Sequence, residues 1–375
     1  MKVYLDYAST CPVDSKVLES MLPFFSELYG NSVSIHQKGK EALIEVQKAR
    51  QVIAQRLGVR SHELIFSSGA TESNNLALKG LAFQHWKKKG HVIVSSFEHK
   101  SVLEAARWLE KEGFSVTYLK VSKEGFVSVE DLKKAFRDDT ILVSIMHGQN
   151  EIGTIQDIAS FGKLCRERKI LFHTDACQSF LKSKIPLEYL DLCSINAHKV
   201  YGPKGIGALY VRQGVKLNPL LHGGGHELNM RGGTLNVPAI VGFGKAVEVY
   251  KEEINATLHF LKEYFASVLK KEFPDIFITS PLNEKGLVHI LHVCFENIDG
   301  NALLAYLNIK GVFASSASAC TSSVQDLSHV LKAVGLKYSL AQGGIRFSLG
   351  KETTQEEIDY VIEVLKEGIE KIGKR

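Results

Sequence analysis

Two reactive side chains, one lysine and one cysteine, stand in segments that would leave them free for chemistry. Lys199 follows the apolar stretch 190–195 and precedes the glycine turn 201–205. A lysine held at a strand end can form a Schiff base, although most lysines are solvated surface charges. Cys320 lies in the run 315–323, which otherwise holds only serine, alanine and threonine. This run predicts a mobile, exposed loop, where a cysteine is unusual and suggests a reactive thiol.

Two further segments could bind a phosphate group and a charged ring. Residues 68–73 read Ser-Gly-Ala-Thr-Glu-Ser between a predicted strand and a predicted helix. Small residues let the backbone approach an anion and a helix N-terminus favours phosphate, but an ordinary capped helix has the same composition. Asp175 ends the apolar stretch 170–174. A carboxylate there could pair with the protonated ring nitrogen of pyridoxal phosphate, or it could cap a helix.

The composition is that of a globular protein with two domains. The 375 residues are 45% hydrophobic and 23% charged, and the net charge is +5. The densest basic cluster, Lys87-Lys88-Lys89, is short, so direct binding to nucleic acid is not expected. The six cysteines form no C-x-x-C pair, which favours reduced thiols in the cytoplasm over a zinc site or disulfides. No signal-peptide core and no apolar run of ~18 residues is present, so no membrane association is expected.

Strands and helices alternate from about residue 40 to residue 211. The predicted strands are 64–66, 91–95, 115–121, 140–146, 170–174, 190–195 and 206–211. The predicted helices are 43–57, 72–89, 100–113, 129–137 and 157–168. This alternation predicts a mostly parallel sheet covered on both faces, which binds its ligands beyond the carboxyl ends of the strands.

The pattern changes after about Asn255 and predicts a smaller α+β domain. Its predicted elements are the helices 258–273 and 302–307, the strands 276–279, 289–295, 312–314 and 345–349, and a closing helix from Gln355. We therefore expect a large domain of residues 14–256 that binds pyridoxal phosphate. A small domain of residues 1–13 and 257–375 would carry the Cys320 loop.

The order of these motifs resembles that of the cysteine desulfurases of the class V aminotransferase group, the type that serves iron–sulfur cluster assembly. The resemblance runs from Tyr4 to Gly350. It rests on Gly69-Ala70-Thr71-Glu72-Ser73, Glu98-His99-Lys100, Asn150-Glu151-Ile152-Gly153, Asp175 with Gln178, His198-Lys199 with Gly202-Pro203-Lys204-Gly205, His222-Gly223-Gly224-Gly225-His226-Glu227, Arg231 with Gly233-Thr234, and Ser318-Ala319-Cys320-Thr321-Ser322. It implies the type I fold of pyridoxal phosphate-dependent transferases, as in aspartate aminotransferase: a large α/β domain with a mainly parallel sheet and a smaller α+β domain.

The resemblance also implies a role for each residue that would hold the cofactor. Lys199 would form the Schiff base and Asp175 would pair with the pyridine nitrogen. Gln178 would bond the ring hydroxyl, and His99 would stack on the ring. The remaining cofactor-binding residues would be Ala70, Thr71, Asn150, Asn196, His198 and, reaching across a homodimer to the neighbouring subunit, Thr234.

The same resemblance implies the substrate and the path of its sulfur. Asn150 and Arg346 would hold the carboxylate of L-cysteine, while Lys199 and His99 would move protons. The Cys320 thiolate would take the sulfur as a persulfide, and alanine would leave. The persulfide would then pass to an acceptor protein, either a cluster scaffold or a tRNA-thiolation enzyme.

Four positions depart from the family's usual residues. Asn196 stands where serine is common, Ser32 where proline is frequent, Leu228 where arginine often follows, and Gly232 in place of a common serine. These positions fall near the expected rim of the site and leave the catalytic efficiency open. The chain also ends soon after its last predicted helix, without the docking tail of scaffold-feeding members, so the sequence does not name the acceptor.

Three alternatives stay open on the sequence alone. One is a related enzyme such as a selenocysteine lyase or an aminotransferase, and an aminotransferase would not need Cys320. Another is a weakly active paralogue that serves as a binding partner, supported only by Asn196 and Leu228. The third, an NAD-binding protein, is disfavoured because neither G-x-G-x-x-G before a helix nor G-x-x-x-x-G-K-[ST] is present.

Overall fold

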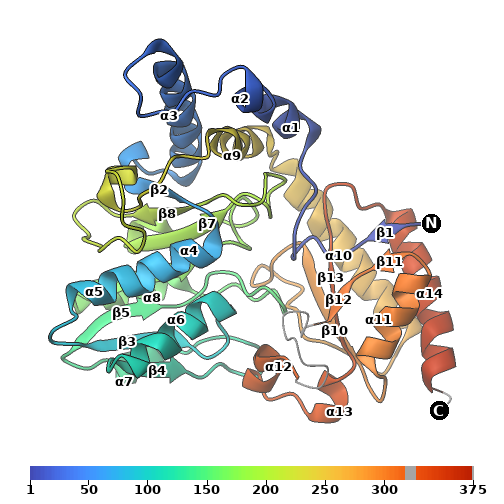
Figure 1. Cartoon of the computed structure of the whole chain (residues 1–375). Coiled ribbons are helices and arrows are strands. Elements are labelled where there is room, and N and C mark those ends of the chain that lie inside the picture. Colours follow the sequence, from blue (N-terminus) through green and yellow to red (C-terminus); the bar gives the residue numbers. More distant parts are fainter. Residues whose placement is uncertain (317–326, 374–375) are drawn as a thin grey trace.

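The computed structural model describes residues 1–316 and 327–373, which form a large α/β body and a smaller α+β body (Figure 1). A seven-stranded sheet of order β2-β8-β7-β6-β5-β3-β4 lies at the centre of the large body. Its strands are β2 (Leu64–Ser67), β3 (His91–Ser95), β4 (Ser115–Leu119), β5 (Thr140–Ser144), β6 (Leu171–Asp175), β7 (Leu192–Asn196) and β8 (Gly207–Val211). Neighbouring strands are parallel except where β8 pairs with β2 and β7. The prediction of a mostly parallel sheet is confirmed.

The one reversed strand, β8, follows directly from a short connection. Residues 197–206 link β7 to β8 without a helix. A parallel neighbour would need a crossover of a dozen or more residues, so β8 runs back beside β7 as in a hairpin. Lys199 therefore lies in a turn whose two ends continue into neighbouring strands of the sheet.

Helices cover both faces of the sheet (Figure 1). In the large body they are α1 (Ser15–Met21), α2 (Pro23–Ser26), α3 (Gln37–Leu57), α4 (Ala70–Asn75), the π-helical turn η2 (Leu76–Gly80), α5 (Leu81–Gln84), α6 (Lys100–Lys111), α7 (Val129–Ala135), α8 (Ile158–Glu167) and α9 (Val237–Val249). Short 3₁₀ turns are η1 (Ser61–Glu63), η3 (Leu187–Tyr189) and η4 (Glu227–Asn229). The sequence predicted α3 and α4 to α8 but not α1, α2 or α9.

The predicted helix 72–89 is too long at its C-terminal end. The helix ends with α5 at Gln84, and a turn follows in which Lys89 has a φ of +58°. The Lys89 ammonium lies 3.6 Å from the ring centroid of Trp86, so a cation–π contact fixes this turn. The expected position of Lys87-Lys88-Lys89 within the last turn of a helix is therefore wrong.

The smaller body combines the two ends of the chain. Its antiparallel sheet has the order β12-β13-β10-β9, and β1 pairs with β11 in parallel. The elements are β1 (Val3–Tyr4), α10 (Glu253–Glu272), β9 (Ile276–Ile278), β10 (Ile290–Phe295), α11 (Gly300–Ile309), β11 (Val312–Phe313), β12 (Ser315–Ser316), β13 (Gly344–Ser348) and α14 (Gln355–Gly373). Val3 and Leu5 are buried in one apolar cluster with the inner faces of α10 and α14.

Two short helices join the smaller body to the larger one. These are α12 (His329–Ala333) and α13 (Tyr338–Ala341). The apolar cluster of the large body includes Val330, Leu331 and Ala341. In the sequence, these residues come between β12 and β13, which are strands of the smaller sheet. Among the helices described, none is both long and apolar enough to cross a membrane.

Candidate active site

The predicted site residues gather at one edge of the large sheet. Asp175 and Asn196 are the last residues of β6 and β7. His99 and Asn150 follow β3 and β5, and Lys199 lies in the turn after β7. Because these strands are parallel, their carboxyl ends meet at the same edge, which is where ligands bind in such sheets.

Asp175 is a buried carboxylate that uncharged donors hold in place. The amide nitrogen of Asn74 donates to Oδ2 at 2.7 Å, and the backbone N–H of Cys177 donates to Oδ1 at 2.9 Å. Burial alone would raise the pKa of Asp175, but these hydrogen bonds act to hold it below its ordinary value. The carboxylate therefore stays ionised and suits a cationic ring nitrogen.

Lys199 is a half-buried amine on a turn that a second lysine holds. Burial lowers the pKa of the Lys199 amine below its ordinary value, although Cys177 and Asp175 act in the opposite direction. A lowered pKa favours the neutral, nucleophilic form that attacks carbonyl compounds. The Lys182 ammonium donates to the backbone carbonyl of Lys199 at 2.7 Å and so holds the turn in place.

The turn between β2 and α4 has room for an anion. Gly69 precedes the helix with a φ of +147°, a conformation that only glycine adopts readily. A Cβ atom on Gly207 would lie 2.8 Å from the Cα atom of Gly69, so both glycines allow β8 and the turn to approach closely. Ala70 and Thr71 then form the first turn of α4. The N–H groups of a first helical turn have no acceptor within the helix and can bind an anion.

Asn196 pairs with Gly207, which lies against Gly69, and His198 follows two residues after Asn196. Asn196 is buried, and its Oδ1 atom has no hydrogen-bond partner within the part of the chain that the structure describes. The Nδ1 atom of His198 lies 3.2 Å from the Thr10 hydroxyl. Burial, with Lys199 close by, lowers the pKa of His198 to about 4, so its imidazole is neutral.

The nitrogen and the oxygen of the Gln178 side-chain amide both have hydrogen-bond partners. Its nitrogen donates to the backbone carbonyl of Ala8 at 2.9 Å, and its oxygen lies 3.2 Å from Nε2 of His289. One amide hydrogen is left for a further acceptor. Gln178 therefore ties the N-terminal segment to the sheet edge.

Arg346 reaches the site from β13 of the smaller body. Its Nη1 atom donates to the backbone carbonyl of Asn150 at 2.7 Å. Its Nη2 atom donates to the Asp6 carboxylate and to the Ser9 hydroxyl, each at 2.8 Å. The Nε atom is buried and has no partner among the described residues. The guanidinium is thus held firmly and keeps one donor for an anionic ligand.

Two predicted site residues are not placed in this cluster. Thr234 is exposed, on the segment after η4. Cys320 lies outside the described residues. The other five cysteines are free and buried. Burial raises the pKa of the thiols of Cys165 and Cys294 to about 12, so neither resembles a reactive thiol.

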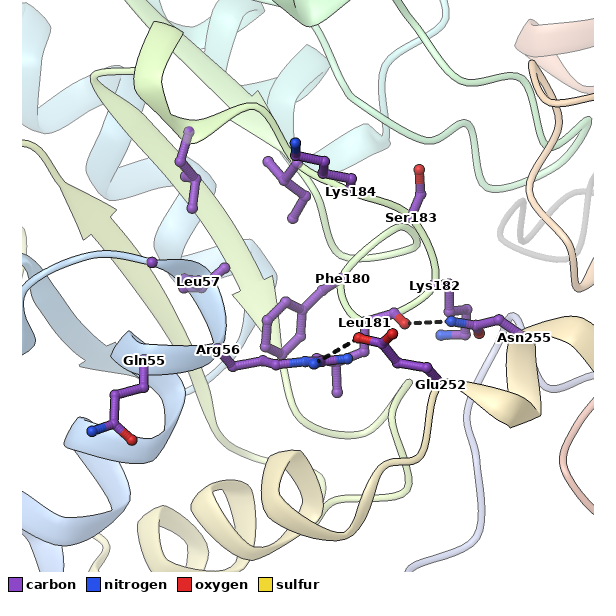
Figure 2. A pocket seen from close by; sticks show the side chains of 13 residues that line it. Gln55, Arg56, Leu57, Phe180, Leu181, Lys182, Ser183, Lys184, Glu252 and Asn255 are labelled. Atoms are coloured by element: carbon purple, nitrogen blue, oxygen red, sulfur yellow. Dashed lines mark hydrogen bonds and ion pairs between the residues drawn. The ribbon is translucent and has the colours of Figure 1, made fainter.

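One cavity borders the predicted site, and a second lies apart from it. The first, of about 500 Å³, is lined by Thr71, His99 and Ser101 together with charged residues such as Lys79 and Arg107. Figure 2 shows another, of about 650 Å³, between the end of α3 and the segment 180–187. There Arg56 pairs with Glu252 at 2.9 Å and Asn255 donates to the carbonyl of Leu181 at 2.8 Å (Figure 2). Of the predicted site residues, only Thr71 and His99 line either cavity.

Four residues that contact the site were not among the residues predicted from the sequence. They are Asp6, Asn74, Ser101 and Lys182. A signal was present for Asn74, which follows the motif 69–73 directly, and for Asp6, which stands at the start of the resemblance. Ser101 and Lys182 had no local signal, because a serine in a first helical turn and a lysine in a loop are common everywhere.

The residues present fit pyridoxal phosphate. An amine of lowered pKa stands near a buried ionised carboxylate. A glycine-lined helix start with free N–H donors lies at the same sheet edge. These are the groups that would hold the aldehyde, the ring nitrogen and the phosphate. Among the described residues, no group of three or more histidine, cysteine or acidic side chains could hold a metal ion.

Fold and site together define an α/β enzyme of the kind that binds pyridoxal phosphate at the carboxyl edge of its large sheet. The model of the family "Aminotransferase class-V" matches residues 3–361. The chain belongs to this family, whose members depend on pyridoxal phosphate.

Relatives of similar length and solved structures agree with this assignment. "Cysteine desulfurase IscS" of Dictyoglomus turgidum is 46% identical over 99% of this chain and 95% of its own length. The protein of the same name from Pasteurella multocida is 47% identical over 99% of this chain and 94% of its own length. Among solved structures, "NIFS-LIKE PROTEIN" has a TM-score of 0.91 and 40% identity, covering 99% of this chain and 100% of its own. "SspA in complex with cysteine" has a TM-score of 0.85 and 40% identity, covering 94% and 100%.

Proposed function

We propose that this protein is a pyridoxal phosphate-dependent cysteine desulfurase, which converts L-cysteine to L-alanine and leaves the sulfur as a persulfide on Cys320. The observation that carries the proposal is the convergence of Lys199, Asp175 and Arg346 on one sheet edge, from two bodies of the fold. The names and high coverage of the relatives support it.

The chemistry of the reaction divides between the cofactor and the chain. Bound pyridoxal phosphate supplies an electron sink for the substrate. Lys199 holds the cofactor and afterwards moves a proton, and Asp175 keeps its negative charge against the ring nitrogen. His99 stacks on the ring, and Gln178 donates its remaining amide hydrogen to the ring hydroxyl. Ala70, Thr71, Asn196 and His198 bind the phosphate.

The substrate is held by its carboxylate and gives up its sulfur to the chain. Asn150 and Arg346 bind the carboxylate, and the free Nε donor of Arg346 supports this role. The Cys320 thiolate forms an S–S bond with the substrate sulfur while the C–S bond breaks. The electron pair of that bond goes to the substrate carbon, which gains a proton and leaves as alanine. The persulfide is then passed to an acceptor protein in iron–sulfur cluster assembly or tRNA thiolation.

We also propose a homodimer in which Thr234 reaches the phosphate of the neighbouring subunit. Thr234 is exposed, as a residue that acts in another subunit must be. Exposed apolar side chains gather on α1, α2 and the segment before α3: Leu18, Leu22, Phe25, Tyr29, Val33 and Ile35. All six lie within residues 18–35, and exposed apolar side chains that are grouped on a surface mark protein interfaces.

Two further proposals concern the layout and the place of action. The division into residues 14–256 and residues 1–13 with 257–375 is supported by the separate apolar cluster that joins Val3 and Leu5 to the C-terminal elements. Action in the cytoplasm is supported by the free thiols of all five described cysteines, since such thiols are typical of reducing compartments.

Two measurements test the function. Purified protein with bound cofactor should be yellow, and borohydride should bleach the band by reduction onto Lys199. Incubation with L-cysteine and excess dithiothreitol, which reduces the persulfide, should release sulfide and alanine in equal amounts. Cys320→Ser should abolish sulfide release and leave the yellow band unchanged. Sulfide release at the wild-type rate from that variant would refute the persulfide route, and a chain that takes up no cofactor would refute the whole proposal.

A further inference from the structure

We infer that Asn74 and Ser101 are positioning residues that connect Asp175 to His99 and decide which ring nitrogen of His99 carries the proton. The inference deepens the proposed function and rests on it for the reaction that His99 serves. The connection itself consists only of protein atoms and is present without a cofactor.

Four side chains form one continuous line of hydrogen bonds. The amide nitrogen of Asn74, a fully buried residue of α4, donates to Oδ2 of Asp175 at 2.7 Å and to Oγ of Ser101 at 2.8 Å. The Ser101 Oγ atom lies 2.8 Å from Nδ1 of His99. The backbone N–H of Ser101 donates to the same ring nitrogen at 3.2 Å. The line therefore joins the end of β6 to the last turn of α4 and the start of α6.

The direction of each hydrogen bond follows from the carboxylate. An ionised carboxylate only accepts, so the Asn74 amide must turn its nitrogen toward Asp175. The opposite rotamer would place Oδ1 against the negative charge. In the observed orientation Oδ1 of Asn74 is buried without a partner among the described residues. Leaving this oxygen unpaired is unfavourable, which indicates that the bonds made by the amide nitrogen decide the orientation.

The donor and the acceptor of each remaining hydrogen bond in the line are then determined. Both amide hydrogens of Asn74 are in use, so Ser101 Oγ accepts one of them and directs its own hydrogen to Nδ1 of His99. Nδ1 receives that hydrogen and the Ser101 N–H, so it cannot carry a proton itself. The proton of the neutral imidazole must lie on Nε2, which is the ring nitrogen left for the cofactor or the substrate.

The same line disfavours a charged His99. An imidazolium would carry a hydrogen on Nδ1 that faces two donors of Ser101. Burial and nearby Lys199 lower the pKa of His99, although Asp175 acts in the opposite direction. His99 is thereby kept neutral in one tautomer, a state suited to exchanging protons at Nε2.

Nitrogen NMR of the cofactor-free protein with ¹⁵N-labelled histidine rings tests the inference. Two-bond ¹H–¹⁵N spectra distinguish the two tautomers, and His99→Gln identifies the His99 signals. Wild type should show an unprotonated Nδ1 and a protonated Nε2. Ser101→Ala and Asn74→Ala should each lose this single-tautomer pattern. The matched control is Ser144→Ala, which removes a buried hydroxyl 2.8 Å from Nδ1 of His173 and should leave His99 unchanged.

Each outcome decides the inference or the function separately. A wild-type spectrum with the proton on Nδ1 overturns the inference, whether or not any variant folds. Folded Ser101→Ala and Asn74→Ala proteins with the wild-type His99 pattern overturn it as well. In the active protein, Ser101→Ala should lower kcat for sulfide release about tenfold with little change in KM. A protein with the predicted spectra but no desulfurase activity would refute the proposed function and leave the inference standing.

Discussion

At the scale of single residues, Arg346 shows how much one planar cation can hold. It bonds Asn150, Asp6 and Ser9 at once and still has a free Nε donor. A lysine cannot reproduce this fork, because its ammonium is a point charge on a flexible stem. We expect Arg346→Lys to raise KM for L-cysteine at least about tenfold, equivalent to ~1.4 kcal/mol of binding.

Steady-state kinetics measure this effect, and the chain offers a matched control. Arg212 directly follows β8 and donates to Asp191 at 2.6 Å. Because β8 is antiparallel to β7, Arg212 lies beside the amino end of β7, at the sheet edge opposite the site. Arg212→Lys should leave KM unchanged. Equal KM values for Arg346→Lys and wild type would show that Arg346 does not bind the substrate.

Glu98 provides a prediction on stability and pH. It is fully buried next to His99, and burial raises the pKa of its carboxyl to about 8. The ordinary value applies to the unfolded chain, so between pH ~4.5 and ~8 the folded state binds more protons than the unfolded state. The contribution of Glu98 to stability therefore falls as pH rises through this range and is constant above it.

Glu98→Gln should remove this contribution. The variant keeps an oxygen that can accept from Ser95 and from the N–H of Met146, as Glu98 does. Its free energy of unfolding should exceed that of wild type at pH 9 by a few kcal/mol at most, and the difference should shrink at pH 5. Urea denaturation at both pH values measures it. A difference that does not depend on pH would show that Glu98 is already ionised within the folded protein at pH 5.

At the scale of elements, α9 shows why a helix can escape prediction. Its Gly242 and Gly244 weaken the helical signal, since glycine is a poor helix former. Packing explains their presence: a Cβ on Gly244 would lie 2.7 Å from the Cα atom of Ala49 in α3. A Cβ on Gly242 would meet the side-chain sulfur of Met21 at 2.6 Å, and that side chain can move.

This contrast predicts different costs for the same substitution in one helix. Gly244→Ala forces two backbones apart and should lower the free energy of unfolding by about 1–3 kcal/mol. Gly242→Ala should be milder, because Met21 can rotate and alanine favours the helix. Thermal unfolding followed by circular dichroism compares the two variants. A larger loss for Gly242→Ala than for Gly244→Ala would contradict the packing described between α3 and α9.

The strands were the elements that the sequence predicted best. Each strand of the large sheet lies within two residues of a predicted apolar run, because a strand buried on both faces needs continuous apolar side chains. The reversal of β8 was not predicted, since an apolar run has no direction. The burial of α12 in the other body's core was also missed, because its contacts depend on the finished fold.

At the scale of the whole molecule, the site exists only because distant segments meet. Asp6 and Arg346 are 340 residues apart in sequence and 2.8 Å apart in space. Lys199 and Asp175 could be predicted, because each follows an apolar strand and strand ends meet. Asp6 and Ser101 could not be, since their local sequences resemble ordinary polar surface. Motif order indicated the chemistry, and the fold supplied the residues that position it.

Exposed apolar side chains of the N-terminal segment predict assembly. Phe25, on α2, is 64% exposed, and Ile35, just before α3, is 91% exposed. Aspartate at both positions would place charges where a second copy packs. In sedimentation experiments we expect the wild type to be a dimer and the double variant Phe25→Asp with Ile35→Asp to be a monomer.

The cofactor gives this prediction a second measurement. If Thr234 binds the phosphate of the neighbouring subunit, separation removes one phosphate contact from each site, and the affinity for pyridoxal phosphate should fall about tenfold. Phe260 is 58% exposed on α10 of the smaller body and provides the control. Phe260→Asp should keep both the dimer and the cofactor. A double variant that stays dimeric would place the subunit interface elsewhere, and a monomer with undiminished cofactor affinity would exclude Thr234 from the phosphate site.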